Sequence, residues 1–202
     1  MDQSGYTQDF ICFERSPEIK GIQYFDPLVA ALENSRVLRL SYLPYYEDKP
    51  YFNEVHPSLR KEFRSRWYLI GYNAYREKVR TYALDRIRNL EALEDKAYIA
   101  AAFEVDDYFK YAIGIIAPEG SPPVIKLAVQ KNQAQYLITQ PWHESQNIEE
   151  ESQEEVVFTF RVHPTYEFRS LVLSLGKDAV VLEPDSLRKE IKGELEEVLK
   201  RY

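Results

Sequence analysis

Residues 37–43 constrain the fold of this chain most strongly, because their side chains alternate in character with a period of two. Apolar residues alternate there with Arg39 and Ser41. A half-buried β-strand has this period, since successive side chains point to opposite faces of a sheet. Three further strand-like segments follow, separated by polar stretches: residues 54–59, 66–73 and 78–84. Short strands with polar turns predict a small β-barrel in this half of the chain.

The region before these strands has a different character. Residues 1–26 include scattered glycine and proline and no sustained period, so they are predicted to be a linker or an N-terminal arm. Asp26 and Pro27 then predict a short helix, with Asp26 as its cap and Pro27 in its first turn. That helix is expected to end near Asn34.

The second half begins at a turn-rich break, residues 118–123, where a domain boundary is plausible. Beyond it, strands and helices are predicted in the order β-α-β-β-α-β plus a final helix. This is the order of the split β-α-β, or ferredoxin-like, arrangement, so the whole chain is predicted to be α+β. The predicted elements are residues 124–129, 132–138, 146–150, 156–162, 166–175, 179–182 and 187–199.

The final predicted helix has an apolar residue at every fourth position. Such a narrow stripe is typical of a helix that packs on a domain body, and a partner surface is the alternative. The stripe consists of Leu187, Ile191, Leu195 and Leu199.

Composition limits the class of protein. The 202 residues are 45% hydrophobic, enough for one sizeable core or two small ones. Cys12 is the single cysteine and cannot form an internal disulfide. The chain has no signal-peptide pattern and no apolar run of the roughly 18 residues that a membrane helix requires. We therefore expect a cytoplasmic protein with no membrane partner.

The charge is unevenly distributed along the chain. The total is -7, but residues 36–90 contain 12 Lys and Arg against 6 Asp and Glu, a local charge of +6, and the remainder carries -13. The cations gather around the aromatic segment 66–73, although a core strand does not need them. This arrangement favours a site for an anionic, flat ligand.

The strand period predicts which side chains share a face. If residues 78–86 form one extended strand, Arg80, Tyr82 and Arg86 lie on one side of it. Pairing this face with the face of Arg66 and Tyr68 would create a patch of guanidinium and phenol groups. Such a patch suits a phosphate-bearing aromatic ligand, because arginine contacts phosphate in a bidentate manner and both groups stack on bases. The alternative is a solvated face or structural ion pairs.

Two neighbours of Tyr68 should instead belong to the core. Trp67 and Leu69 point opposite to Tyr68 and are expected to be buried in the barrel.

Catalytic patterns are weak in this sequence. The three histidines, His56, His143 and His163, are far apart, and none has a neighbouring Cys or His at metal-ligand spacing. The seven glycines form no phosphate-binding loop. We expect neither an enzyme nor a metal or cofactor site.

Several motifs together resemble a known family. The segments 56–59, 66–71 and 80–87 resemble the WYL domain, named after a Trp-Tyr-Leu triplet that is present here as Trp67, Tyr68 and Leu69. The segments 141–146, 174–176 and 181–188 resemble the C-terminal extension called WCX. The motifs occur in the order and spacing of the family, and the resemblance covers about residues 26–202.

The resemblance implies a bacterial transcriptional regulator. In this family an N-terminal helix-turn-helix binds DNA, and the WYL domain, an SH3- or Sm-like barrel, senses a ligand such as a nucleotide or short nucleic acid. It implies a WYL domain over 27–117 and a WCX domain over 118–202. Residues 1–26 are too few for a helix-turn-helix, so we expect this chain to be the sensor half of a regulator, either cut from a longer protein or encoded alone. By analogy with the family, we expect a homodimer.

The resemblance also extends the expected site. Ser41 and Tyr42 lie where the family's first strand lines the site, and His56 matches its His-Pro form. Glu54 and Ser58 replace an arginine and a tyrosine that many members carry, which points to a different or weaker ligand. The expected ligand-binding residues are Arg80, Arg86, Tyr68, Arg66, Ser41, Tyr42 and His56.

Two hypotheses about function follow. In the first, the chain binds an anionic effector and so changes the DNA affinity of a helix-turn-helix. In the second, it is a structural module for dimerisation or scaffolding, whose basic strand packs against an acidic surface.

Overall fold

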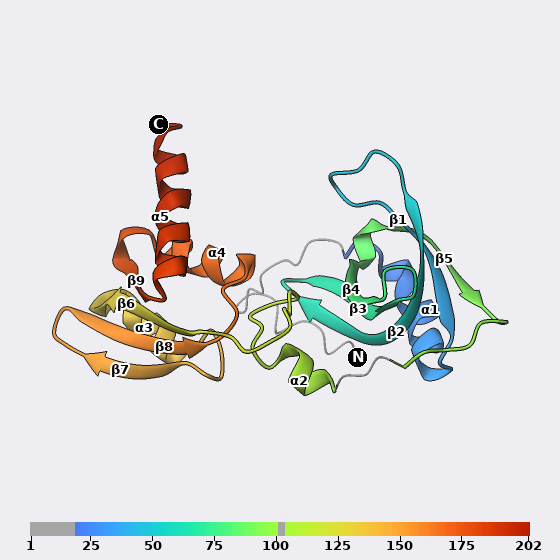
Figure 1. Cartoon of the computed structure of the whole chain (residues 1–202), viewed down its shortest axis with the longest axis horizontal. Helices are drawn as coiled ribbons and strands as arrows, with labels where there is room; N and C mark the ends of the chain where they lie inside the picture. The colour runs from blue at the N-terminus through green and yellow to red at the C-terminus, as the bar shows by residue number, and fades with distance from the viewer. Residues whose placement is uncertain (1–18, 101–103) are drawn as a thin grey trace, which may run out of the picture. The chain divides into compact units, whose positions relative to one another are not determined.

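The computed structural model describes residues 19–100 and 104–202 (Figure 1). The described residues fall into two compact units, one within 1–102 and the other within 103–202, which we call the N-terminal and C-terminal units. Most of the predicted linker, residues 1–18, lies outside the described residues, as does Cys12. The chain is a mixed α+β protein with two antiparallel sheets, in agreement with the predicted class.

The N-terminal unit is built on a five-stranded sheet. Its strands follow the order β4-β3-β2-β1-β5, and every neighbouring pair is antiparallel. A 3-10 turn, η1, and a helix, α1, precede the sheet, and a second 3-10 turn, η2, separates β4 from β5. The bounds are η1 Ile22–Tyr24, α1 Phe25–Glu33, β1 Val37–Tyr42, β2 Tyr51–Phe63, β3 Arg66–Asn73, β4 Lys78–Ala83, η2 Leu84–Arg86 and β5 Ile87–Leu93.

Helix α1 supplies apolar side chains to the core of this unit. Leu28 and Ala31 are buried, and they cluster with apolar residues from all five strands and η2. The cap at Asp26 was wrongly predicted: the helix begins at Phe25, and Asp26 lies in its first turn. The helix ends at Glu33, close to the predicted end, and the side-chain amide of its C-cap residue Asn34 donates to the Ala30 carbonyl at 2.8 Å.

The strand boundaries show where local pattern was sufficient. The predictions for β1 and β3 hold to within one residue. Strand β2 is longer than predicted, because its pairing with β1 and β3 extends it well beyond 54–59. The strand predicted over 78–84 holds to within one residue, but its assumed continuation to residue 86 is wrong, since β4 stops at Ala83 and residues 84–86 form the tight turn η2. Strand β5 was not predicted.

Gly71 allows two central strands to approach closely. A Cβ atom at this position would lie 2.6 Å from the His56 carbonyl oxygen and 2.7 Å from a methyl group of Val55. Real Cβ atoms do not approach other atoms this closely, so any larger residue would push β3 away from β2. Glycine at the end of the Trp-Tyr-Leu segment is therefore a packing requirement.

The C-terminal unit contains a four-stranded antiparallel sheet in the order β7-β8-β6-β9. Its elements follow the predicted order, β-α-β-β-α-β plus a helix, after an additional short helix, α2, that was not predicted. The bounds are α2 Val105–Phe109, β6 Val124–Gln130, α3 Lys131–Thr139, β7 Asn147–Glu151, β8 Glu155–Arg161, α4 Tyr166–Ser174, β9 Ala179–Glu183 and α5 Asp185–Leu199.

Aromatic rings fill the core of this unit. Phe158, Phe160 and Phe168 are almost fully buried, and Trp142 stacks on Phe160 with ring centroids 5.8 Å apart. Trp142, in the WCX-like segment 141–146, thus packs against the core of its own unit.

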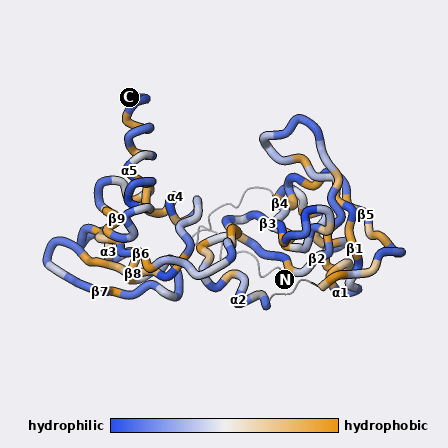
Figure 2. Tube along the Cα trace, in the orientation of Figure 1, coloured by the Kyte–Doolittle hydropathy of each residue, from blue (hydrophilic) through white to orange (hydrophobic). Residues whose placement is uncertain are grey.

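The stripe of α5 is only half buried. Leu187 and Ile191 lie in the core, whereas Leu195 is 49% and Leu199 is 74% exposed. Figure 2 shows hydrophobic positions interspersed with hydrophilic ones along the last turns of this helix. The expectation of a packing stripe is correct for its first half alone. No helix among the described residues is long and apolar enough to cross a membrane.

Candidate ligand-binding site

A cavity of about 190 Å³ opens in the N-terminal unit beside β4. Its walls come from β1, the loop that leads to β2, β2 itself, the turn between β3 and β4, β4 and η2. Its side chains are mainly phenols and guanidinium groups, with a single amide. The lining residues are Tyr42, Pro44, Tyr46, Tyr51, Asn53, Arg76, Arg80, Thr81, Tyr82 and Arg86.

A chain of hydrogen bonds fixes the wall near Asn53. The backbone N–H of Arg76 donates to Asn73 Oδ1 at 2.8 Å. Asn73 Nδ2 in turn donates to Asn53 Oδ1 at 2.8 Å and to the Tyr82 hydroxyl at 2.7 Å. Asn53 Nδ2 is buried and has no hydrogen-bond partner among the described residues. Because a buried unpaired donor costs about 1–3 kcal/mol, this amide is a group that a ligand can satisfy.

Three tyrosine rings build the inner part of the cavity. Tyr42 meets Tyr82 edge to face at 5.2 Å and Tyr51 at 6.2 Å between ring centroids. Burial raises the pKa of all three phenols, and that of Tyr82 to about 12. They therefore keep their protons at neutral pH, and their hydroxyl groups can donate hydrogen bonds.

Arg76 and Arg80 are the two cations of the cavity that have no carboxylate within ion-pair distance among the described residues. Both are exposed, and the positive charges of both lower the pKa of Tyr51 and Tyr82, against the larger effect of burial. An arginine without an internal counter-ion keeps its full capacity to bind an external anion.

Arg86 contacts an aromatic ring and a carboxylate. Its guanidinium lies over the Tyr45 ring, 4.2 Å from the centroid, and its Nε lies 3.9 Å from Asp85 Oδ1. The Nε is buried and makes no hydrogen bond within the described residues. Arg86 thus contributes a positioned cation to the cavity while part of its charge is compensated by Asp85.

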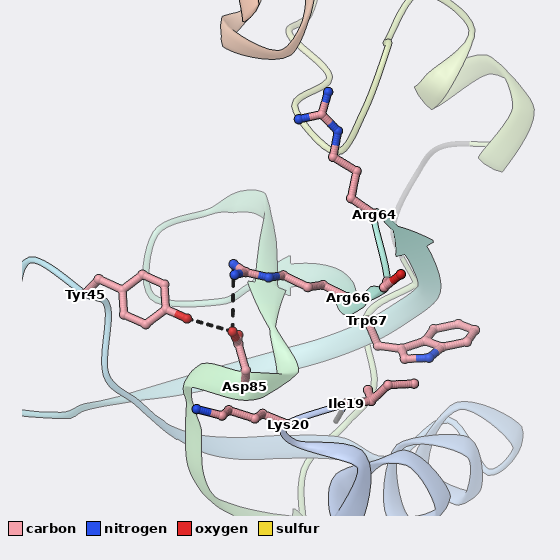
Figure 3. Close-up of a pocket in the computed structure, with 8 residues that line it drawn as sticks. Ile19, Lys20, Tyr45, Arg64, Arg66, Trp67 and Asp85 are labelled. Carbon is pink, nitrogen blue, oxygen red and sulfur yellow. Dashed lines mark hydrogen bonds and ion pairs between the residues drawn. The ribbon is translucent and has the colours of Figure 1, made fainter. Parts of the chain in front are cut away.

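Asp85 also organises a second pocket, of about 200 Å³ (Figure 3). The Tyr45 hydroxyl donates to Asp85 Oδ2 at 2.7 Å, and Arg66 Nη1 lies 3.9 Å from the same oxygen. In Figure 3 the Arg66 side chain extends toward Asp85, whereas Arg64 points away. Lys20 and Trp67 are among the other residues that line this pocket. A carboxylate at its centre makes this pocket less suited to an anion than the first.

The predicted residues divide between these places. Tyr42, Arg80 and Arg86 line the first cavity together, and Arg66 lines the second. Tyr68 is 7% exposed and lies near Arg66 and Arg86, whose charges lower its pKa against the raising effect of burial. The structure therefore separates Arg66 and Tyr68 from the cavity that holds Arg80.

The predicted pairing of faces was wrong by one residue. In the register of β3 and β4, Leu69 pairs with Tyr82 and Gly71 with Arg80, whereas Tyr68 pairs with Ala83. Directly paired residues of antiparallel strands lie on the same side of the sheet. The face of Arg80 and Tyr82 is thus that of Leu69. Leu69 is fully buried, as predicted, and Trp67 packs partly buried against the same core.

Ser41 and His56 do not line either pocket. Ser41 is buried in β1. His56 is 4% exposed and accepts a hydrogen bond at Nδ1 from the Ile99 backbone N–H at 2.9 Å. Its ring centroid lies 5.9 Å from that of Tyr72 and 5.8 Å from that of Tyr98. Its surroundings are those of a structural histidine, and burial lowers its pKa.

Sequence reasoning missed several lining residues. Arg76 and Tyr46 lie in segments predicted as polar loops, and Asn53 precedes the weak strand segment 54–59. Their proximity depends on strand pairing, so no local pattern could identify them. An asparagine at each of two strand ends, Asn53 and Asn73, was the one available hint. No group of His, Cys, Asp and Glu side chains among the described residues could hold a metal ion.

Two family models match the chain. One is described as the WYL domain and matches residues 23–92, and the other is described as the WCX domain and matches residues 121–199. These matches confirm the resemblance predicted from the motifs. No curated protein matches the chain.

Solved structures with a similar chain include two of different length. One is proteasome accessory factor B/C (PafBC) of Arthrobacter aurescens, with 21% identity and a TM-score of 0.39 over 93% of this chain. The other, described as a CRISPR Cas-related protein, has 14% identity and a TM-score of 0.56 over 90% of this chain, and it shares the fold. The chain spans 28% and 52% of those two chains, respectively.

Proposed function

Because this chain belongs to the WYL domain family, with a WYL domain followed by a WCX domain, we propose that it is the ligand-sensing module of a transcriptional regulator. Its effector is a nucleotide or short nucleic acid that binds in the cavity beside β4. One observation carries this proposal: Arg76 and Arg80 lack carboxylate partners among the described residues, and they line a cavity whose other walls are mainly tyrosine.

The chemistry of the cavity supports an anionic aromatic ligand. Each arginine offers a planar fork for phosphate oxygens, and phenol rings provide stacking surfaces for bases. Two of the large aromatic side chains here are also exposed: Tyr46, itself a lining residue, is 83% exposed, and Tyr75, which precedes Arg76 in the turn between β3 and β4, is 91% exposed. Proteins commonly bind single-stranded nucleic acid through a surface that combines exposed aromatic rings with unpaired cations.

The two sheets support specific architectures for the two domains. The order β4-β3-β2-β1-β5, with β5 returning to pair with β1, supports an SH3- or Sm-like barrel for the WYL domain. The order β7-β8-β6-β9, with two helices as crossovers, supports a ferredoxin-like WCX domain. We propose that the WYL domain lies within residues 27–117 and the WCX domain within 118–202, with the segment from α2 to residue 117, which belongs to the C-terminal unit, as the connection between the two family domains.

Regulation requires that the effector bind two conformations of the regulator with different affinity. We propose that the bound effector changes the DNA affinity of a helix-turn-helix that belongs to the rest of the regulator or to a partner chain. The loop between β1 and β2 and the turn η2 both line the cavity, so the ligand contacts segments that connect the strands as well as the strands themselves.

Fluorescence anisotropy with labelled single-stranded DNA and RNA at several salt concentrations tests the proposal. Binding should weaken with salt, and Arg76→Ala and Arg80→Ala should each weaken it and reduce the slope against log salt by about 0.7. Arg36→Ala is a matched control, since Arg36 is exposed, carries the same charge and lines neither pocket. Equal losses in all three variants, or binding to none of the probes, would overturn the proposal.

The exposed end of α5 favours a second candidate function, dimerisation. Leu195, Val198 and Leu199 are 49%, 52% and 74% exposed on the C-terminal turns of the helix. Apolar side chains that gather on one helix face are typical of a partner surface. Analytical ultracentrifugation of the wild-type chain and of a Leu195→Glu, Leu199→Glu double variant tests this function. A wild-type dimer that becomes a monomer in the variant supports dimerisation through this helix face. An unchanged mass excludes this face as the dimer interface.

A further inference from the structure

The hydrogen bonds around Asn73 determine how the amide of Asn53 is oriented. Asn73 Oδ1 accepts from the Arg76 backbone N–H, so the other end of the Asn73 amide must be its NH₂ group. That NH₂ group donates to Asn53 at 2.8 Å, and the accepting atom must therefore be Asn53 Oδ1. The remaining atom of the Asn53 amide is Nδ2, a donor that has no partner among the described residues.

Tyr82 provides a second available donor next to this amide. Its oxygen accepts from the same Asn73 NH₂ group at 2.7 Å, so the hydroxyl hydrogen itself is free to point elsewhere. Burial raises the pKa of Tyr82 to about 12, and the hydrogen is therefore retained throughout the neutral range. Asn53 and Tyr82 both line the cavity, and both are at least 95% buried.

These two donors differ in kind from the arginines of the cavity. Asn53 and Tyr82 are buried and neutral, whereas Arg76 and Arg80 are exposed and charged. A phosphate gains most from the guanidinium groups, because charge-assisted hydrogen bonds are about twice as strong as neutral ones. The buried neutral pair suits a neutral acceptor, and a carbonyl oxygen is the common acceptor of this type on a nucleobase.

The volume of the cavity limits how much of the ligand enters it. Pockets that enclose a whole drug-sized ligand have volumes of about 300–1,000 Å³. This cavity, at about 190 Å³, has room for one ring-sized group. The rest of a nucleotide or strand would lie outside, where the exposed arginines and aromatic rings are.

We propose that Asn53 Nδ2 and the Tyr82 hydroxyl select a carbonyl-bearing nucleobase, thymine or uracil above all, and discriminate against adenine, which has no carbonyl oxygen. This inference rests on the proposed function, because it assigns the base preference of the same cavity. Asn73 acts as a positioning residue, since it orients both donors without itself lining the cavity.

The test uses oligonucleotides in which a single base is present on an otherwise abasic backbone. The phosphate charge and the length stay constant, and base stacking within the probe is removed. Anisotropy titration of the wild-type chain should give thymine an affinity several-fold to about tenfold higher than adenine, the size of one or two net hydrogen bonds.

Asn53→Asp changes the proposed donor with little change of shape. One carboxylate oxygen can still accept from Asn73, and the other replaces the NH₂ group by an acceptor. The added negative charge weakens the binding of both probes to the same extent. The informative quantity is therefore the ratio of the affinity for the thymine probe to that for the adenine probe. That ratio should fall to one or below, since the adenine amino group can donate to the new oxygen. Asn89→Asp adds the same charge at an exposed position on β5, outside both pockets, and should keep the wild-type ratio.

Each outcome decides one of the two proposals. Salt-dependent binding of the wild-type chain with equal affinity for thymine, adenine and the fully abasic strand overturns the base preference and leaves the proposed function intact. Binding of no probe at all overturns the proposed function. A folded Asn53→Asp variant that still prefers thymine also overturns the inference. If thermal melting shows that this variant is unfolded, Tyr82→Phe replaces it, and an unchanged ratio in that variant overturns the inference.

Discussion

Asn73 Nδ2 donates to Asn53 Oδ1 at 2.8 Å, and this bond joins the end of β3 to the beginning of β2 inside the N-terminal unit. Asn73 is completely buried, and its other amide atom accepts from the turn that carries Arg76. The Asn73 side chain thus positions the Asn53 amide, the Tyr82 hydroxyl and the turn that carries Arg76 around one cavity.

Replacing Asn73 by alanine should lower stability and weaken ligand binding at the same time. The change leaves Asn53 and Tyr82 without their shared partner, and each buried group left unpaired costs about 1–3 kcal/mol. Chemical denaturation monitored by tryptophan fluorescence measures the first effect, and anisotropy measures the second. A loss of stability with unchanged ligand binding would contradict the positioning role.

Gly71→Ala should destabilise the N-terminal unit by about 1–3 kcal/mol, the usual cost of overpacking, because its Cβ atom would lie 2.6 Å from a backbone oxygen of β2. Gly193→Ala in α5 is the matched control. Apart from its chain neighbours and the backbone of its own helix, nothing lies within 4 Å of a Cβ atom at that position, so the alanine should instead stabilise the helix by about 1 kcal/mol. Thermal melting of the two variants should show shifts of opposite sign.

The unfolding free energy should decrease on acidification below about pH 6.5. Burial lowers the pKa of His56, an effect that Glu54 opposes and Lys96 assists. The unfolded chain then binds more protons than the folded chain between the folded pKa and 6.5, so the contribution of His56 is complete above 6.5 and is lost as the pH falls. Burial lowers the pKa of His143 in the C-terminal unit too, which adds to the same trend.

The contribution of His56 can be isolated with His56→Asn. Asparagine does not titrate, and its oxygen can still accept from the Ile99 backbone N–H. Denaturation curves between pH 5 and 8 should show a shallower pH dependence in this variant. An identical slope in variant and wild type would contradict burial of a neutral imidazole.

Arg66→Ala should change nucleic acid affinity and its salt dependence far less than Arg80→Ala does. Arg66 belongs to the pocket around Asp85, whose carboxylate already compensates its charge, whereas Arg80 has no such partner among the described residues. Anisotropy titrations at two salt concentrations compare the variants directly. Equal effects would place the ligand across both pockets.

Much of the fold was predictable because it depends on local pattern. The alternation in 37–43 and the aromatic segment 66–73 predicted β1 and β3, and turn residues predicted the order of elements after residue 118. The end of β4 was not predictable in this way. No glycine or proline interrupts residues 78–86, but the chain turns at Leu84, where Gly21 of the preceding segment lies directly against the backbone.

The types of residue in the candidate site were predictable from the sequence, but their arrangement in space was not. The sequence by itself determined that cations and tyrosines gather in residues 36–90 and that a WYL and a WCX domain follow one another. Only the tertiary structure decided that Arg66 faces Asp85, that Arg76 joins Arg80, and that the Asn53 amide keeps an unused donor. The reason is physical: alternation and turn chemistry act between neighbours in sequence, whereas strand register, ion pairing and hydrogen-bond satisfaction depend on residues that only folding brings together.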